Sequence, residues 1–448
     1  MSETPGSTNI STKLQRIAKL ASGAPTMAFT NLAHHIDIDW LVRAYNLTRK
    51  DGAVGIDGQT AQEYAADLEE NLRSLLERLK SGRYKAPPVR RVYIPKSDGR
   101  SVRPIGIPTF EDKVLQRAVS MVLEAVYEQD FLDCSYGFRP GRSAHQALET
   151  LWRQTMAMGG GWVLDVDIQG FFDALDHRHL RSFLNSRVRD GVLRRVVDKW
   201  LKAGVLEEGF LQGRDGGTPQ GGVISPLLAN IYLHIVLDEW FDRQVKPRLR
   251  GQAFLIRYAD DCAIVFARED DAKRVMEVLP KRFGRFGLCL HPDKTRLVPF
   301  RRPSRGGKPA GTTQSCHGTF DLLGFTHFWA KSRRGSWVVK RRTAKDRLRR
   351  SLRATNQWLG RNRHLPIPDQ HRALWRKLRG HYAYYGITGN ARCLQDFQQQ
   401  VARLWKKWLG RRSQRAGKPW ERFMLLLRRY PLPEPVVVHS IYRRAANP

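Results

Sequence analysis

The chain has 448 residues, enough for two or three domains with hydrophobic cores of their own. Its 77 Lys and Arg against 43 Asp and Glu give a formal net charge of +34, which points to a polyanionic partner. No apolar run approaches the ~20 residues that a membrane span needs, and the first thirty residues have no apolar segment typical of a signal peptide. The five cysteines are scattered and never spaced C-x-x-C, which argues against a zinc ribbon or a disulfide framework and favours a reducing cytoplasm.

The first two thirds of the chain predict a mixture of helices and strands. Residues 1–35 are basic and rich in Ser, Thr and Gly, and we expect them to be largely mobile. Residues 36–85 have a helical pattern, and residues 88–108 alternate apolar and basic side chains as a strand hairpin does. Residues 111–127 predict an amphipathic helix, after which strands and helices alternate to about residue 300.

The C-terminal third is helical and strongly basic. A Gly-, Pro- and Arg-rich stretch at 301–313 predicts a loop, and Pro366 and Pro368 divide the helical pattern of residues 340–425 into two groups. Residues 331–448 contain 30 Lys or Arg, 5 Asp or Glu and six of the twelve Trp. Aromatic rings among basic side chains can stack on unpaired bases, although tryptophans at this density also serve as packing anchors between helices.

Two adjacent acids lie between apolar runs in F-L-I-R-Y-A-D-D-C-A-I-V-F, residues 254–266. The runs predict a β-hairpin with Asp260 and Asp261 at its turn. Neighbouring carboxylates in apolar surroundings repel each other and lose solvation, and a bound divalent cation removes both penalties. For an isolated pair a solvated Asp-Asp turn is the usual alternative, so the acids upstream decide the interpretation.

Residues 162–176, W-V-L-D-V-D-I-Q-G-F-F-D-A-L-D, supply those upstream acids. Apolar alternation predicts a short buried strand with Asp165 and Asp167 on one side, ending near Gly170. A strand that delivers one carboxylate beside a hairpin that delivers two would build a site for two Mg²⁺ ions. Phosphoryl transfer depends mainly on positioning and charge neutralisation, so such a site needs no covalent nucleophile. The pattern predicts the palm of a polymerase.

The motif Y-A-D-D at 258–261 and the motif D-I-Q-G-F-F-D at 167–173 resemble two core motifs of reverse transcriptases. Nearly the whole chain resembles the reverse transcriptase–maturases encoded by bacterial group II introns. Six further blocks match in the family's order: G-A-V-G-I-D-G at 52–58, Y-I-P-K-S-D-G-R-S-V-R-P-I-G-I-P-T at 93–109, S-Y-G-F-R-P-G-R-S at 135–143, G-T-P-Q-G-G-V-I-S-P-L-L-A-N at 217–230, G-L-C-L-H-P-D-K-T at 287–295 and L-L-G-F at 322–325. An ordered set of this size is highly specific.

The resemblance implies roles for residues at the matched positions. Asp167, Asp260 and Asp261 would hold two Mg²⁺ ions, or Mn²⁺ in their place, with help from the backbone carbonyl of Ile168. A second group would contact the incoming deoxynucleotide: Lys96, Arg103, Gly170, Phe171, Phe172, Gln220 and Lys294.

Chemistry supports several of these nucleotide contacts. Phe172 lies five residues after the first acid, where the resemblance implies a ring that would collide with a 2′-OH. Lys96 and Arg103 have the charge to grip a triphosphate, and Lys294 is a candidate general acid for the leaving pyrophosphate. Gly170 has no Cβ, so backbone N–H groups can approach the phosphates. Without the resemblance, the alternative interpretation is that the phenylalanine is a core residue, the lysines and the arginine are solvated surface cations, and the glycine belongs to a turn.

The C-terminal segments L-R-G-H-Y-A-Y-Y-G-I-T-G-N at 378–390 and W-K-K-W-L-G-R-R-S-Q-R at 405–415 resemble the family's maturase segment. In the family this segment binds the intron RNA together with the thumb, and L-L-G-F forms a primer grip. By residue type, we expect RNA contacts from seven side chains: Tyr382, Tyr384, Tyr385, Trp405, Lys406, Arg411 and Arg412. Many relatives continue into an H-N-H nuclease, and the absence of such a segment before Pro448 predicts the endonuclease-lacking type.

The implied fold is α+β: a right-hand polymerase of fingers, palm and thumb with a C-terminal α-helical maturase domain. We expect a mobile basic extension at 1–35, fingers and palm at 36–330, the start of the thumb at 331–365, and the rest of the thumb with the maturase domain at 366–448.

The implied function is RNA-directed DNA synthesis together with assistance to splicing of the parent intron. The partners would be an RNA template with a DNA primer, deoxynucleotides, group II intron RNA and a DNA target, in a bacterial cytoplasm and at the nucleoid when bound to DNA. Two alternatives stay open: an RNA-binding splicing factor that does not use its polymerase, and a domesticated or defence-associated reverse transcriptase.

Overall fold

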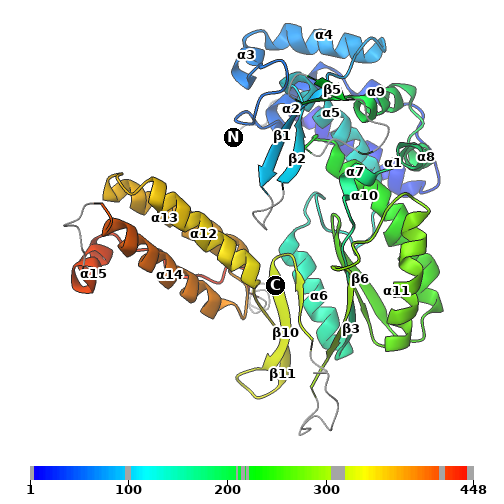
Figure 1. Cartoon of the computed structure of the whole chain (residues 1–448). Coiled ribbons are helices and arrows are strands. Elements are labelled where there is room, and N and C mark those ends of the chain that lie inside the picture. The colour runs from blue at the N-terminus through cyan, green and yellow to red at the C-terminus, as the bar shows by residue number, and fades with distance from the viewer. Residues whose placement is uncertain are drawn as a thin grey trace. The chain divides into compact units, whose positions relative to one another are not determined.

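The computed structural model describes residues 5–95, 102–207, 210–212, 217, 221–303, 318–412 and 419–440. The chain forms two compact units (Figure 1), one of Met1–Ala147 with Leu164–Leu297 and one of Leu148–Val163 with Val298–Pro448. Both contain helices and strands, which confirms the predicted α and β mixture. Within the described ranges no helix combines the length and the apolar character that crossing a membrane requires.

Helices form most of the first unit up to residue 127. They are α1 (Pro5–Gly23), η1 (Ala33–His35), α2 (Ile38–Leu47), α3 (Ala61–Ala66), α4 (Leu68–Lys80) and α5 (Phe110–Tyr127). Both α1 and α2 pack along α5, and the indole Nε1 of Trp40 donates to the carbonyl of Ala118 at 2.9 Å. Residues 5–23 therefore differ from the expected mobile segment: Ile17 and Ala21, four positions apart on one helix face, are fully buried.

The predicted hairpin at 88–108 is confirmed. Strands β1 (Val89–Pro95) and β2 (Val102–Ile107) pair antiparallel, and the S-D-G-R turn between them lies outside the described residues. Strand β1 also pairs parallel with β4 (Val205–Glu207), which pairs antiparallel with β5 (Phe210–Gln212). The resulting sheet has the order β2-β1-β4-β5.

A second four-stranded sheet contains both acidic motifs. Its order is β6-β7-β3-β8, formed by β6 (Ala253–Tyr258), β7 (Asp261–Phe266), β3 (Gly160–Val166) and β8 (Arg296–Arg301). The hairpin predicted around Asp260 is confirmed, since Tyr258 pairs with Asp261 across the turn. Strand β7 lies beside β3, and Cys262 at the start of β7 lies 4.0 Å from the carbonyl of Val166 at the end of β3, so the hairpin turn lies near the carboxyl end of β3, where Asp167 follows.

Further helices lie before and between these strands along the chain. The set comprises α6 (Ala144–Met158), α7 (Phe171–Ala174), α8 (His177–Arg187), α9 (Gly191–Lys202), α10 (Ser225–Leu233), two π-helical turns η2 (His234–Asp238) and η3 (Phe241–Val245), η4 (Lys246–Arg248) and α11 (Glu269–Gly284). Helix α11 packs against β7 (Figure 1), and α8 packs against both α9 and α10. The π-helical turns continue α10 and widen its path, a geometry that often accompanies functional sites.

A buried arginine ties the segment after α1 to the rest of the first unit. The guanidinium of Arg187 pairs with the Asp130 carboxylate at 2.7 Å and donates to three backbone carbonyls, those of Ala21, Ala24 and Met27, at 2.6–3.1 Å. All five N–H donors are used, so the charge is buried without an unmet hydrogen bond.

The second unit combines a small sheet with a helical bundle. Strands β9 (Phe320–Leu322), β10 (Phe325–Lys331) and β11 (Trp337–Thr343) pair antiparallel in the order β11-β10-β9. The helices are α12 (Lys345–Arg361), α13 (Ile367–Tyr385), α14 (Ala391–Leu409) and α15 (Trp420–Arg429). The predicted break between two helical groups is present: Pro366 is the N-cap residue of α13, and Pro368 lies in the first turn of that helix. Leucine and aromatic side chains from all four helices form one core.

Asp112, in α5, is a buried acid that links three elements of the first unit. Its carboxylate accepts hydrogen bonds from Trp200 Nε1 at 2.6 Å, Gln116 Nε2 at 3.0 Å and the Tyr84 hydroxyl. Burial raises the pKa of Asp112 to about 6, and these hydrogen bonds offset the effect only in part.

We expect Asp112 to make the stability of the first unit depend on pH. Its folded pKa lies above its unfolded value, so its contribution to the free energy of unfolding is present below pH 4 and is lost as the pH rises through 6. The total change is about 3 kcal/mol. Asp112→Asn cannot ionise, so its free energy of unfolding relative to the parent should improve between pH 4 and 6 in urea titrations. A constant difference between the two proteins over this range would contradict the assignment.

Candidate active site

The hairpin turn between β6 and β7 presents two carboxylates at the end of an apolar sheet. Ala259 has a φ of +58°, a left-handed conformation that is uncommon for a residue with a Cβ, and Asp260 and Asp261 follow it directly. Burial raises the pKa of Asp260; the neighbouring Asp167 carboxylate also raises it, and Arg103 opposes this. Both Asp167 and Arg103 therefore lie close enough to Asp260 for their charges to affect its pKa.

Asp167 is fixed by the chain segment that precedes β8. Its carbonyl accepts a hydrogen bond from the backbone N–H of His291 at 2.8 Å, and the Thr295 hydroxyl lies 3.3 Å from the same oxygen. The ammonium of Lys294 lies 3.4 Å from the Asp167 carboxylate. The G-L-C-L-H-P-D-K-T block thus contacts the first acidic motif and places Lys294 beside Asp167, while the role of Lys294 stays a prediction.

The two acids of D-V-D have different partners. Asp165 lies on β3 and pairs with Arg296 of β8 at 3.4 Å. Asp167 follows the strand, and its charge raises the pKa of Asp260. The pairing with Arg296 gives Asp165 a role within the sheet, and Asp167 stays the predicted site carboxylate of this motif.

The segment after Asp167 contains two adjacent phenylalanine rings, of which one is buried and the other is partly exposed. Gly170 has a φ of +55°, and a Cβ built there would meet open space. Phe171 is buried, whereas Phe172 is only partly buried; their ring centroids lie 5.3 Å apart. Of the two predicted rings, Phe172 is the one with surface to offer a ligand.

Residues on both sides of T-P-Q-G are held close to this segment. The N–H of Gly217 donates to the carbonyl of Leu175 at 2.8 Å, and a Cβ on Gly217 would come within 2.9 Å of the Asp173 carbonyl oxygen. A Cβ on Gly221 would come within 2.6 Å of the Gly106 carbonyl in β2. Glycine is therefore required at both points. Lys96 and Gln220, two of the predicted nucleotide contacts, lie outside the described residues.

The donor chemistry of the acidic residues suits a hard divalent cation. Carboxylate oxygens and a backbone carbonyl are the ligands that Mg²⁺ prefers, and a cation would relieve the repulsion between Asp167 and Asp260 that raises the pKa of Asp260. In the part of the chain that the structure describes, no three Asp, Glu, His or Cys side chains are grouped closely enough to hold a metal ion. The number of ions and the role of the Ile168 carbonyl therefore stay predictions.

A buried network behind the turn was not anticipated from the sequence. Arg257 of β6 is fully buried and contacts Asp238, Asn230, Ser135 and the carbonyl of Ala259. The signal was a single charge in the otherwise apolar run F-L-I-R-Y, at a position whose neighbours Leu255 and Ile256 are also buried.

Several predicted RNA contacts are core residues. Trp405 is fully buried and donates to Gln370 Oε1 at 2.9 Å; Tyr382 is 1% exposed, and its hydroxyl donates to the Pro433 carbonyl at 3.1 Å. The partly buried Tyr384 donates to the Leu323 carbonyl at 2.9 Å, and Tyr385 packs against Phe325. Trp405 and Tyr382 have no surface for RNA unless the helices separate, because their rings fill the space between helices.

The three predicted basic contacts lie at or near the surface, and each has a structural partner. The ammonium of Lys406 lies 4.8 Å from the ring centroid of Trp420, and Arg412 donates to the Leu365 carbonyl at 2.6 Å. Arg411 is exposed beside the ring of Trp408. Their charges face solvent, so they remain available to phosphate.

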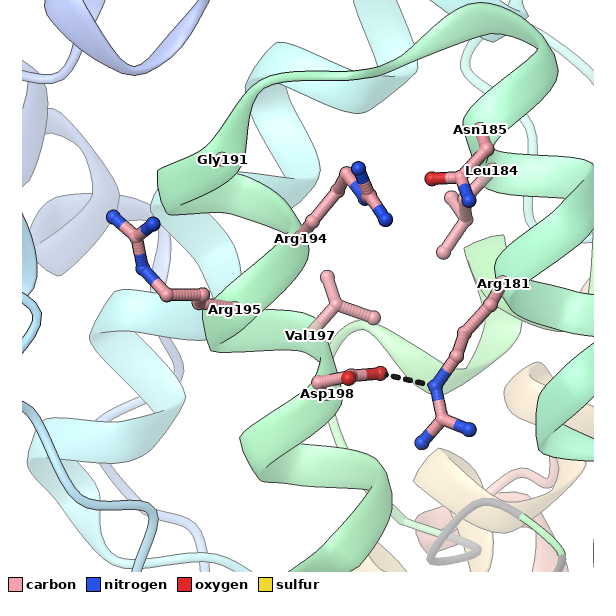
Figure 2. A pocket seen from close by; sticks show the side chains of 8 residues that line it. All are labelled: Arg181, Leu184, Asn185, Gly191, Arg194, Arg195, Val197 and Asp198. Carbon is pink, nitrogen blue, oxygen red and sulfur yellow. Dashed lines mark hydrogen bonds and ion pairs between the residues drawn. The ribbon is translucent and has the colours of Figure 1, made fainter.

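A cavity of about 280 Å³ lies between α8 and α9 (Figure 2), and neither Asp167 nor Asp260 lines it. Its polar lining includes Arg181, Arg194, Arg195 and Asn185, with Arg181 paired to Asp198 at 2.5 Å. Arg194 points toward Asn185, and Arg195 points away on the other side of α9. None of the predicted site residues lines this cavity.

Comparison with known proteins agrees with this geometry. Residues 94–327 match the family model described as reverse transcriptase (RNA-dependent DNA polymerase). The chain is 41% identical over 248 residues to the group II intron-encoded protein LtrA of Lactococcus lactis subsp. cremoris; the match covers 53% of this chain and 40% of that protein. It is 34% identical over 328 residues to the protein YkfC of Escherichia coli K12, covering 64% of this chain and 84% of YkfC.

The matched model spans more than half of the chain, so the protein belongs to the reverse transcriptase family. The resemblance to group II intron-encoded members is confirmed by the similarity to LtrA. A weaker similarity, 29% over 179 residues, extends to nuclear intron maturase 2, mitochondrial, of Arabidopsis thaliana, covering 32% of this chain and 24% of that protein.

Proposed function

We propose that the protein is an RNA-directed DNA polymerase that extends a DNA 3′-OH with deoxynucleotides copied from RNA. The observation that supports this most directly is the position of β7 beside β3 in one sheet, where Cys262 lies 4.0 Å from the Val166 carbonyl, so that the end of β3 before Asp167 lies close to the β6–β7 turn that carries Asp260. The two acids are far apart in sequence and belong to the family's two acidic motifs. On this proposal the β6-β7-β3-β8 sheet is the palm and the β1–β2 hairpin belongs to the fingers.

The residues around the acids fit the parts of the reaction. Asp167, Asp260 and Asp261 would hold two Mg²⁺ ions, which supply charge neutralisation and activation of the primer 3′-OH when bound. Arg103, near Asp260, would contact the triphosphate. Lys294, beside Asp167, would donate a proton to the leaving pyrophosphate.

Replacing one acid should remove the chemistry and leave the fold. Asp260→Asn or Asp167→Asn should reduce extension of a DNA primer on an RNA template by more than about 100-fold, because an amide replaces a charged metal ligand. Melting temperature and RNA affinity should stay close to those of the parent. Asp165→Asn is the matched control, since Asp165 pairs with Arg296 and should keep most of the activity. Undiminished extension by either site variant would overturn the assignment.

Phe172 should select the sugar of the incoming nucleotide. Its ring is partly exposed next to the buried Phe171, so its removal opens space without emptying the core. Phe172→Ala should raise the ratio of ribonucleotide to deoxynucleotide incorporation by about tenfold or more, as measured by kcat/KM for each. Phe171→Leu serves as a control and should not change the ratio. If the ratio is the same in Phe172→Ala and the parent, the ring has no part in selection.

We also propose that the second unit binds group II intron RNA and assists splicing. Its sequence holds 30 Lys or Arg against 5 Asp or Glu in residues 331–448, and its core helices are packed by buried Trp and Tyr side chains. Affinity would come from phosphate contacts by exposed cations and specificity from the shape of the ordered helices. Residues 331–365 would begin the thumb, and residues 366–448 would complete it and form the maturase domain.

The charge variant uses Arg403, Lys407 and Arg411 of the α14 region, whose side chains are exposed; Lys407 and Arg411 also lie beside the ring of Trp408. Replacing these three by Ala should weaken intron RNA binding and make the slope of log affinity against log salt shallower by about 2. Primer extension on a short template should be largely kept.

The control for this experiment removes three exposed cations from the first unit, Lys19, Lys80 and Lys202. If both triple variants lose the same affinity and assist splicing equally, charge in general explains binding and the maturase assignment of this segment fails.

A further inference from the structure

The Y-A-D-D turn rests on a completely buried ion pair. Arg257, the residue before Tyr258, and Asp238, at the end of the π-helical turn η2, both have side chains that are 0% exposed. The guanidinium binds the carboxylate through two nitrogens, Nε at 2.8 Å and Nη2 at 2.5 Å. Such a pair is costly to desolvate, and it is retained only if its remaining donors also find partners.

All five donors of Arg257 are used, and one of them holds the catalytic turn. Nη1 donates to the Ala259 carbonyl at 3.1 Å and to Asn230 Oδ1 at 2.9 Å, while Nη2 also donates to the Ser135 hydroxyl at 2.7 Å. Ala259 is the residue with the left-handed φ of +58° that precedes Asp260. The guanidinium therefore fixes the peptide that sets the direction of the acids.

A second layer closes the turn from behind. Asn230 Nδ2 donates to the Gly137 carbonyl at 2.7 Å, and a Cβ on Gly137 would come within 2.3 Å of the Ala259 nitrogen. The backbone of Arg257 also pairs with this segment, accepting from Tyr136 and donating to Cys134. The S-Y-G-F-R-P-G-R-S block thus lies directly against the turn, with Arg257 and Asn230 joining the two.

We propose that Arg257, together with Asn230 and Asp238, is a positioning element that holds Asp260 and Asp261 in the orientation needed for divalent cations. The Asp238 carboxylate offsets part of the charge of Arg257, and the pair holds the turn through the geometry of its hydrogen bonds. A lysine at this position would keep the charge but lose the planar fork that bonds Ala259, Asn230 and Ser135 at once. This proposal rests on the proposed polymerase site.

The chain provides a matched control for substitution of a buried arginine. Arg187 is likewise buried, pairs with one aspartate through two nitrogens and uses all five donors, but its other bonds go to Ala21, Ala24 and Met27. Arg187→Lys should therefore lower the melting temperature much as Arg257→Lys does, without reaching the turn.

The experiment measures Mn²⁺ binding to the full chain by electron paramagnetic resonance, alongside the Mg²⁺ concentration for half-maximal primer extension. Arg257→Lys should weaken Mn²⁺ binding and raise the Mg²⁺ requirement by about 10- to 100-fold, the usual effect of losing an outer-shell partner. Arg187→Lys should leave both at parental values. Asn230→Ala, which spares the ion pair, should shift both in the same direction by a smaller factor and serves if Arg257→Lys does not fold.

Parental Mn²⁺ affinity in both folded Arg257→Lys and Asn230→Ala would overturn the positioning role. An equal loss of Mn²⁺ affinity in Arg257→Lys and Arg187→Lys would also overturn the positioning role, since reduced stability alone would then explain the weaker binding. A different result would show that the proposed function is wrong: the parent protein would bind Mn²⁺ through Asp260 but would not extend any primer on an RNA template.

Discussion

Burial of a carboxylate at the end of an apolar sheet, next to a second carboxylate, is the constraint on which the rest of the first unit depends. Burial of Asp260 raises the free energy of the folded chain when the group is charged, and the nearby charge of Asp167 adds to this. Nearby cations reduce the penalty: Lys294 pairs with Asp167, and Arg103 lies close enough to lower the pKa of Asp260. The surrounding backbone must hold the acids together against their repulsion, and tight glycine contacts at Gly137 and Gly217 are part of that support.

The two units use aromatic and basic residues in different ways. In the first, the buried arginines Arg257 and Arg187 use all their N–H donors in hydrogen bonds, and some of these bonds fix backbone segments. In the second, tryptophans and tyrosines fill part of the helical core, Arg341 is buried, and many other basic residues are exposed, where counterion release can contribute to RNA affinity. A polyanion would thus bind the second unit through its surface charge, and the shape of the packed helices would contribute in addition.

Local pattern predicted the elements of the site well, because alternation and turn chemistry act over a few residues. The hairpin around Asp260, the strand before Asp167 and the proline break before α13 all follow from such short-range rules. Burial of Tyr382 and Trp405 could not be read from residue type, since an aromatic ring among cations suits both stacking on RNA and packing between helices. The Arg257 network joins segments more than one hundred residues apart, and a single sequence gives no measure of such pairing.

The long-range pairing of Ser135 with Arg257 has a consequence for how the protein is made. The acid at the end of β3 is synthesised early, but its partners on the hairpin, and the arginine that orients them, come about ninety residues later. A growing chain that has reached β5 therefore holds an isolated Asp167 and a Ser135 segment with no strand to pair with. Closing these loops costs chain entropy that only the completed sheet repays, so the active site should be among the last parts of the first unit to become ordered.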